Sequence, residues 1–522
     1  MIINFLIIIQ ELDMSSIRVG NGQMNKNIIM NLSAFLLQLI INLYISPIIV
    51  ANVNTSAYGF MNMANDFVSY ASIITSIFNS VAARFIANEF YHNNYETANK
   101  YFNSLLLTNI ILSIVLGSIG FVITSMLEAV LNIPSSIIVD VKITFALIFL
   151  SYIISLLTMV YTTATFVTNR TDIQGVRNII NYVIRFSCIL LFINFISIKI
   201  YWVAFSTLLG NIVISLVNIR LTKKLTPELR VNLKTANIKY VKILAASGIW
   251  MSITSISAIL MRGLDLIIAN KLLDSNLMGI LSLARTMPNN VTSVINTIAP
   301  LFTPVFIMLY SKQEKNKLTA AVVSSIHNIS AIMYVPIAGF IVLANDFYGI
   351  WQNSLGKEEL ALVVILSNIT VLQAFFNSST ATLAQISVVT NKLKIPVLVS
   401  LGSGILNVII VILFIEYSPL GIYSIVIISS VIMILRYIVF TPIYASYCLG
   451  LPVKIFYKDL LKIWILIPIL IISMNLVHIN FKAVTKWSEL GIEIILCGII
   501  GYVETVCILY YKKVISWLKK KK

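Results

Sequence analysis

Residues 103–126 read NSLLLTNIILSIVLGSIGFVITSM and contain no charged side chain. A run of this length crosses the hydrocarbon core of a bilayer as an α-helix, which needs about 20 mainly apolar residues. Apolar and polar residues do not alternate along it, as they would in a barrel strand. Because unpaired backbone groups are costly in hydrocarbon, the run predicts a transmembrane helix.

The same pattern recurs along the whole chain. The protein has 522 residues, of which 58% are hydrophobic and only 11% are charged, and its mean hydropathy is +0.93. No soluble fold could bury this much apolar surface. A hydropathy scan predicts about fourteen spans, the first near residues 27–50 and the last near residues 490–511. We therefore expect an all-α integral membrane protein.

Two features of the chain carry no functional signal. The cysteines, Cys188, Cys448, Cys497 and Cys507, lie in or beside apolar runs without paired spacing, so we expect small packing residues rather than a redox or metal site. Residues 1–13 hold an apolar stretch too short to span, with no preceding basic residue. We expect this segment to be dispensable, with Met14 or Met24 as the start.

Positive charges are concentrated on one side of the predicted helices. Most of the 37 lysines and arginines lie near the termini or in loops that follow even-numbered spans. The opposite side holds Lys142, Lys199, Lys271, Lys357, Lys482 and Lys486. Basic loops stay in the cytoplasm, so we expect both termini to be cytoplasmic and the number of spans to be even.

An internal repeat relates the two halves of the chain. Residues 59–91 align without gaps to residues 279–311, and both segments open with a glycine and end at a polar loop. Parallel duplication is typical of transporters in which two lobes move about a central site. The predicted division is an N-terminal cytoplasmic segment (1–26), an N-lobe of helices 1–6 (27–218), a basic cytoplasmic linker (219–243), a C-lobe of helices 7–12 (244–447), helices 13–14 (448–511) and a polybasic tail (512–522).

Several short motifs carry a resemblance to a known family. They are Lys26-Asn27 with Asn31, Tyr58-Gly59-Phe60, Ala83-Arg84-Phe85-Ile86-Ala87, Asp265, and Met278-Gly279-Ile280-Leu281-Ser282. With fourteen expected helices, the chain resembles the polysaccharide transporter family, which flips O-antigen or capsule repeat units. This family belongs to the superfamily of multidrug extruders and lipid II flippases.

The resemblance implies two pseudo-symmetric six-helix lobes plus two C-terminal helices, with a cavity lined mainly by helices 1, 2, 7 and 8. It also implies a polyprenyl-pyrophosphate-linked oligosaccharide as the substrate, taken from the inner leaflet of the bacterial cytoplasmic (inner) membrane. The sequence departs from the lipid II flippases because the first span, and the second span as far as Arg84, contain no arginine.

Charged residues inside the predicted spans are the candidates for function. Each costs about 2.5–3.5 kcal/mol on insertion scales. The arginines are Arg185, Arg262, Arg285 and Arg436. Arg185 and Arg436, in the inner half of the membrane, could attract a pyrophosphate or extend to the interface.

The acidic candidates are Asp66 and Asp265, to which we assign gating or coupling. Arg262 and Asp265 are three residues apart and predicted on one helix face, whereas Asp66 aligns beside Arg285 in the repeat. The pattern leaves two arrangements open, an internal Arg262–Asp265 pair or a contact of Asp66 with Arg285 or Arg262 across the cleft.

Polar residues at helical spacing predict a wet cavity along the same helices, although polar contacts between packed helices give the same pattern. The predicted substrate-binding residues are Arg262, Arg285, Asn289, Asn296, Gln38, Asn42, Arg185 and Arg436. No metal, nucleotide or phosphate-loop motif is present, so we expect no cofactor and no metal.

The tail at residues 512–522 mixes apolar residues with lysines, which indicates an anchor on anionic lipids and not nucleic-acid binding. Other membrane proteins of polysaccharide assembly are further candidate partners.

One competing function is a multidrug or metabolite extruder of the same superfamily. Another is a membrane glycosyltransferase or polymerase, but the longest outer loop, at residues 127–142, has only Glu128 and Asp140 as acids. We therefore expect a transporter and not an enzyme.

Overall fold

A computed structural model describes residues 21–168, 170–481 and 484–509. Within these ranges, fourteen helices are long and apolar enough to cross a membrane, which confirms the predicted all-α architecture. The predictions for residues 1–13 and for the tail at residues 512–522 lie outside the described residues.

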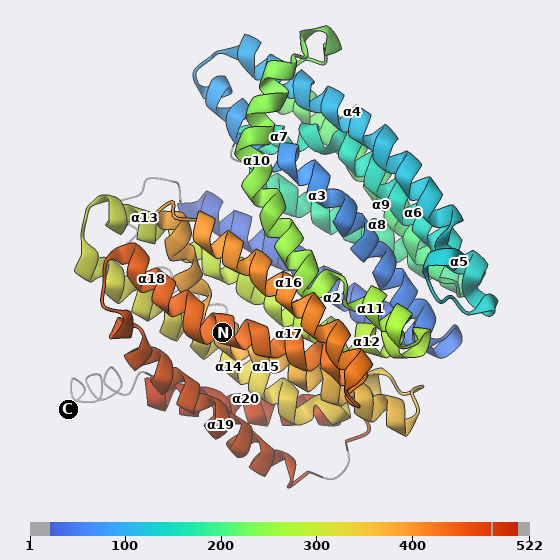
Figure 1. The fold of residues 1–522 in the computed structure, drawn as a ribbon, viewed down its shortest axis with the longest axis vertical. Helices are drawn as coiled ribbons and strands as arrows, with labels where there is room; N and C mark the ends of the chain where they lie inside the picture. The colour runs from blue at the N-terminus through green and yellow to red at the C-terminus, as the bar shows by residue number, and fades with distance from the viewer. Residues whose placement is uncertain (1–20, 169, 482–483, 510–522) are drawn as a thin grey trace.

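The first six spans form the N-lobe. Their helices are α2 (Asn21–Asn52), α3 (Thr55–Tyr91), α4 (Tyr95–Ser125), α6 (Ile138–Thr158), which continues through η2 (Met159–Thr162) into α7 (Thr163–Val167), α8 (Thr171–Phe195) and α9 (Ile200–Leu225). Two short elements, α5 (Leu127–Val130) and η1 (Ser135–Ile137), join α4 to α6. Figure 1 shows α4, α6, α8 and α9 grouped in one body of the molecule.

The next six spans follow the linker, which contains η3 (Leu233–Thr235). Their helices are α10 (Ile238–Ala258), the π-helix η4 (Ile259–Gly263), α11 (Asp265–Leu272), α12 (Ser275–Ile298), η5 (Ala299–Phe302), α13 (Thr303–Ser311), α14 (Lys315–Trp351), α15 (Lys357–Val389), α16 (Lys394–Tyr417), α17 (Ile422–Leu435), the π-helix η6 (Arg436–Phe440) and α18 (Thr441–Leu449). Helices α14 to α17 lie together in the second body (Figure 1).

The last two spans follow η7 (Val453–Ile455) and are α19 (Tyr457–His478) and α20 (Trp487–Leu509). Both pack against α14, as Figure 1 shows at the lower edge of the second body. Met474 of α19 and Cys497 of α20 are buried in the same hydrophobic cluster as Tyr334 of α14. The two additional helices are therefore part of the core of the C-lobe.

The internal repeat is confirmed in detail. The span from Thr55 to Tyr91 and the span from Ser275 to Ser311 both have 37 residues. The turns that follow them are also alike, because Asn93 and Gln313 both adopt a φ of 58°. The sequence offset of 220 residues thus holds for helix starts, helix ends and turn conformation alike.

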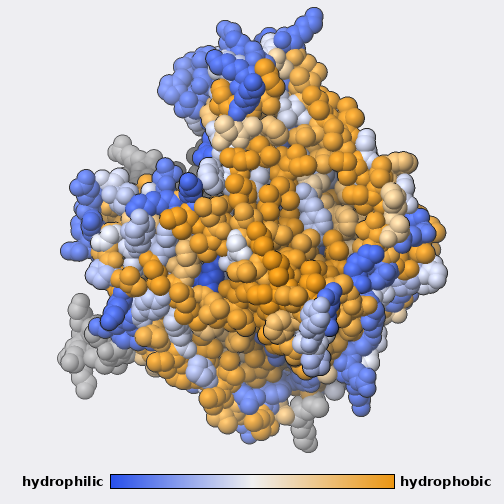
Figure 2. Space-filling model, viewed as in Figure 1, coloured by the Kyte–Doolittle hydropathy of each residue, from blue (hydrophilic) through white to orange (hydrophobic). Residues whose placement is uncertain are grey.

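The surface fits a lipid environment. Figure 2 shows a broad hydrophobic surface over the helices and hydrophilic residues gathered toward the extremities of the molecule. Large apolar side chains such as Phe121 and Phe195 are 75% and 81% exposed, which only a lipid solvent makes favourable. The chain is a multi-pass membrane protein.

Candidate substrate cavity

The two lobes meet where α3 crosses α12, and the contact joins residues related by the repeat. A Cβ atom built on Gly59 would lie 2.9 Å from the Cα atom of Gly279, so the backbones approach as only glycine permits. Three residues further along, the Asn62 amide donates a hydrogen bond of 2.7 Å to Ser282 Oγ across the same offset of 220 residues. The pseudo-twofold axis that relates the lobes therefore passes through this crossing.

Further contacts join the lobes near the same end of the helices. Asn132 and Asn270 exchange three hydrogen bonds of 2.8–3.1 Å, in each of which the side chain of one residue pairs with the backbone of the other. Trp351 Nε1 donates to the Leu43 carbonyl at 2.7 Å, and the Gln352 amide donates to Ser46 Oγ at 2.9 Å. We call this region, where α2, α11 and α14 end and α3 and α12 begin, the closed end.

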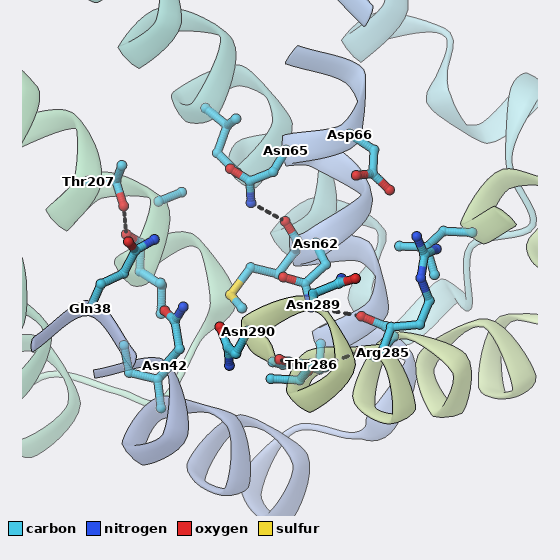
Figure 3. Close-up of a pocket in the computed structure, with 18 of the residues that line it drawn as sticks. Gln38, Asn42, Asn62, Asn65, Asp66, Thr207, Arg285, Thr286, Asn289 and Asn290 are labelled. Atoms are coloured by element: carbon cyan, nitrogen blue, oxygen red, sulfur yellow. Dashed lines mark hydrogen bonds between the residues drawn. The ribbon is translucent and has the colours of Figure 1, made fainter. Parts of the chain in front are cut away.

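A cavity lies between the lobes next to this contact. Its volume is about 350 Å³, and it is lined by residues of α2, α3, α6, α8, α9, α11 and α12. Figure 3 shows Gln38, Asn42 and Thr207 on one side of it, and Asp66 and Arg285 on the other. The cavity is therefore walled by side chains of both lobes.

Amide side chains are the most frequent polar groups of the lining. They are Gln38, Asn42, Asn62, Asn65, Asn289 and Asn290. Gln38 Oε1 accepts a hydrogen bond of 2.8 Å from the Tyr182 hydroxyl, which fixes its orientation, while the buried Nδ2 atom of Asn290 has no hydrogen-bond partner in the described residues. Each amide offers both donors and an acceptor, so together they suit a ligand rich in hydroxyl groups.

The cavity has one arginine from each lobe. Arg285 of α12 lies with Nη1 3.4 Å from Asp265 Oδ2, and its Nη2 donates to the Arg262 carbonyl at 2.7 Å. Arg185 of α8 also lines the cavity, and its buried Nε has no hydrogen-bond partner in the described part of the chain. Asp66 lies on the Arg285 side (Figure 3).

The arrangement of Arg262 corrects one prediction. We expected Arg262 and Asp265 to share a helix face, but Asp265 pairs with Arg285, and the Arg262 guanidinium donates at 2.8 Å to Gln373 Oε1 of α15. The reason is the π-helical turn η4 at Ile259–Gly263, whose wider turn changes the angular relation between residues three apart. The Tyr70 hydroxyl donates to the Gly263 carbonyl and ties this turn to α3.

The predicted binding residues fall into two groups. Gln38, Asn42, Arg185, Arg285 and Asn289 line the cavity. Arg262, Asn296 and Arg436 are not among its lining residues. Arg436 lies in the second π-helical turn, η6, and Arg262 and Arg436 both interact electrostatically with Tyr437.

The sequence prediction missed several lining residues. Tyr58, Asn65, Thr207, Thr286 and Asn290 face the cavity, and the Tyr58 hydroxyl lies 3.1 Å from Thr286 Oγ1 of the other lobe. Asn290 and Asn65 are sequence neighbours of the predicted residues Asn289 and Asp66, and this proximity could have suggested that they line the cavity. Thr207 gave none, because α9 was not expected to line the cavity.

Comparisons with known proteins agree with this architecture. The chain matches the family described as "Polysaccharide biosynthesis protein" over residues 24–310. It is 26% identical over 436 residues to the uncharacterized membrane protein EpsK of Bacillus subtilis (strain 168), which covers 83% of this chain and 85% of that protein.

Two solved structures share the fold. The lipid II flippase MurJ in an inward closed conformation has a TM-score of 0.65 at 14% identity, over 93% of this chain and 100% of that chain. An inward-facing multidrug resistance MATE family transporter of the MOP superfamily has a TM-score of 0.67 at 14% identity, over 81% of this chain and 98% of that chain. With the family match spanning more than half of its length, the chain belongs to the polysaccharide biosynthesis protein family and has the fold of the MOP superfamily transporters.

Proposed function

We propose that the protein is a flippase that moves polyprenyl-pyrophosphate-linked oligosaccharide repeat units from the inner to the outer leaflet of the bacterial cytoplasmic membrane. The observation that carries this proposal is the composition of the cavity, which combines Arg185 and Arg285 from opposite lobes with six amide side chains. Guanidinium groups bind phosphate oxygens through paired, charge-assisted hydrogen bonds. Amides bind sugar hydroxyls through hydrogen bonds that are not specific for one sugar.

The same lining argues against an extruder of cationic drugs. Cationic ligands are held by aromatic faces and uncompensated carboxylates, but Tyr58 is the one aromatic residue among the lining residues, and Asp66 shares its side of the cavity with Arg285. The description of the matched family also names polysaccharide biosynthesis and not drug resistance. The extruder is therefore the alternative outcome of the test below.

The direction of loading follows from the charge distribution. The basic loops favour placing both termini and the basic linker in the cytoplasm, which makes the closed end the outer end. In this conformation the cavity would receive a head group from the inner leaflet, while hydrogen bonds such as Asn62 to Ser282 seal the outer side. Alternating access then requires the α3–α12 crossing to open.

Binding of the substrate favours opening of the α3–α12 crossing because the substrate competes with a carboxylate for Arg285. Asp265 lies against the Arg285 guanidinium, and Asp66 is on the same side. A pyrophosphate would compete with Asp265 for Arg285, because a guanidinium offers a limited set of donors. The released carboxylate then no longer holds the start of α11 to the middle of α12, beside the turn that the Tyr70 hydroxyl ties to α3. Substrate therefore shifts the population toward the outward-open state, as differential binding requires.

The proposal is tested by identifying what the purified protein binds. The protein is extracted in a mild detergent, and its bound lipids are analysed by mass spectrometry, with Arg185→Ala plus Arg285→Ala as the matched control. We expect polyprenyl-pyrophosphate glycolipid with the wild type and its loss from the double variant. Binding of a cationic dye such as a rhodamine, without any glycolipid, would favour the extruder instead. We also propose that the basic tail contacts anionic lipids and that the protein associates with other membrane proteins of polysaccharide assembly.

A further inference from the structure

A group of three ionisable side chains lies outside the cavity, where α14, α19 and α20 meet near the closed end. Asp346 comes from α14, His478 is the last residue of α19, and Glu493 lies in the second turn of α20. His478 Nδ1 is 2.6 Å from Glu493 Oε1 and 3.8 Å from Asp346 Oδ2. One oxygen or nitrogen atom from each residue falls within 4.8 Å of the other two.

The group contains two carboxyl side chains with little exposure to the surroundings. The Glu493 side chain has no exposed area and the Asp346 side chain is 13% exposed. Glu493 Oε2 and Asp346 Oδ2 are buried atoms that accept no hydrogen bond in the described residues. His478 is the one basic side chain within 4 Å of either carboxylate in the described residues. Two buried carboxylates this close together are unfavourable without a stronger positive charge between them.

We propose that Asp346, His478 and Glu493 bind a divalent transition-metal ion of the Zn²⁺ class. Zn²⁺ binds both imidazole nitrogen and carboxylate oxygen atoms, and three protein ligands leave a fourth position for water. A mixed nitrogen and oxygen set distinguishes such ions from Mg²⁺ and Ca²⁺, which favour oxygen ligands alone.

The geometry requires only small side-chain movements. Zinc bonds of about 2.0–2.2 Å in a tetrahedron place ligand atoms about 3.4 Å apart. His478 Nδ1 and Glu493 Oε1 must therefore separate by about 0.8 Å, and His478 Nδ1 and Asp346 Oδ2 must approach by about 0.4 Å. The Nδ1 atom binds a metal only through its lone pair, so metal binding replaces the present contact between Nδ1 and Glu493 Oε1 with two bonds to the ion.

The surroundings indicate what the ion would do. An apolar cavity of about 380 Å³ lies between the same three helices, lined by residues such as Leu343, Leu490 and Cys497. An ion shared by the three helices would fasten α19 and α20 to the C-lobe. No metal motif is visible in the sequence because the three ligands come from separate helices.

The test uses the full-length protein in lipid nanodiscs, purified with a tag that contains no histidine. Bound metal is measured by elemental mass spectrometry after incubation with Zn²⁺ and removal of free ions, and Co²⁺ is used as a spectroscopic probe of the ligand set. We expect one ion per chain, a tetrahedral Co²⁺ absorption spectrum, and a higher thermal unfolding temperature with Zn²⁺.

Variants locate the ion. His478→Ala, Asp346→Asn and Glu493→Gln are each expected to weaken Zn²⁺ binding by more than about 100-fold, since even indirect partners of a metal cost 10- to 100-fold. The matched control is His327→Ala, which removes another histidine, on α14 itself, whose Nε2 atom lies 3.6 Å from Asp459 Oδ1. It should bind Zn²⁺ like the wild type. A wild-type protein that retains no Zn²⁺ and gives no tetrahedral Co²⁺ spectrum would overturn the proposal, as would equal binding by all four variants.

Discussion

Gly59 and Gly279 lie face to face where α3 crosses α12, and each is the repeat equivalent of the other. A Cβ atom on Gly279 would lie 2.9 Å from the backbone nitrogen of Ser56, and one on Gly59 would lie 2.9 Å from the Gly279 Cα atom. The Met278 side chain, which also lies close to the Gly59 position, can rotate away, but the backbone atoms that block both positions cannot. The crossing can therefore close only while both positions lack a side chain.

Gly279→Ala should consequently disfavour the closed end. Overpacking a tight contact costs about 1–3 kcal/mol, which shifts a two-state population by about 5- to 150-fold. The measurement is disulfide formation between Ser56→Cys and Ser275→Cys in a background without the natural cysteines, because the two Oγ atoms are 3.4 Å apart. Cross-linking should slow with Gly279→Ala. Gly402→Ala on α16 is the control, since nothing lies within 4 Å of its added Cβ atom, and equal slowing in both variants would contradict the prediction.

Arg185 and Arg285 should matter more than Arg262 for binding of the lipid pyrophosphate. The first two line the cavity, whereas the Arg262 guanidinium is turned toward Gln373. Arg185→Ala and Arg285→Ala are each expected to weaken binding by about 10- to 150-fold, because a hydrogen bond to a charged group contributes about 1.5–3 kcal/mol. Arg262→Ala should change binding by less than either. The affinities are measured on inserted protein, and a dominant effect of Arg262→Ala would relocate the phosphate site.

Asp66→Asn should weaken coupling more than binding. The substitution removes a negative charge on the Arg285 side of the cavity and leaves the cations in place, so the pyrophosphate keeps its partners. We expect lipid affinity within about threefold of the wild type and a much lower rate of repeat-unit export. The comparison is between binding to purified protein and export in cells. An equal loss of both would instead place Asp66 in direct contact with the substrate.

Both ends of the chain should face the cytoplasm, as the distribution of basic residues predicts. Reporter fusions or impermeant cysteine labelling at the C-terminus should show no external exposure. External labelling there would reverse the proposed direction of loading.

A start at Met14 should leave insertion and export intact, and failure of that shortened chain to insert would show that residues 1–13 are required.

Much of this architecture could be predicted from the sequence because lipid solvation imposes strong patterns. Hydropathy alone located the fourteen spans, and the glycines at residues 59 and 279 marked a repeat that the structure shows as a direct contact. Polar residues at helical spacing, such as Gln38 and Asn289, identified the cavity because a polar stripe in a membrane helix needs a polar environment.

The remainder depends on tertiary geometry that local pattern does not encode. The π-helical turn at Ile259–Gly263 changed which residue Asp265 contacts, and nothing in its composition predicts a π turn. Asn132, in the loop between α5 and η1, contacts Asn270 of α11, and Asp346, His478 and Glu493 come from three separate helices. Such contacts follow from how the helices pack, so a single sequence does not reveal them.

The central claim is that the arginines of the two lobes hold a lipid-linked pyrophosphate, and one binding measurement tests it most directly. Purified protein in nanodiscs is titrated with polyprenyl-pyrophosphate oligosaccharide, and the wild type is compared with Arg285→Ala and with Arg285→Lys. The claim predicts saturable binding by the wild type, a loss of about 10- to 150-fold for Arg285→Ala, and partial recovery for Arg285→Lys, which restores the charge without the planar two-point grip. Equal affinity for all three proteins, or binding that dephosphorylated polyprenyl oligosaccharide matches, would contradict it.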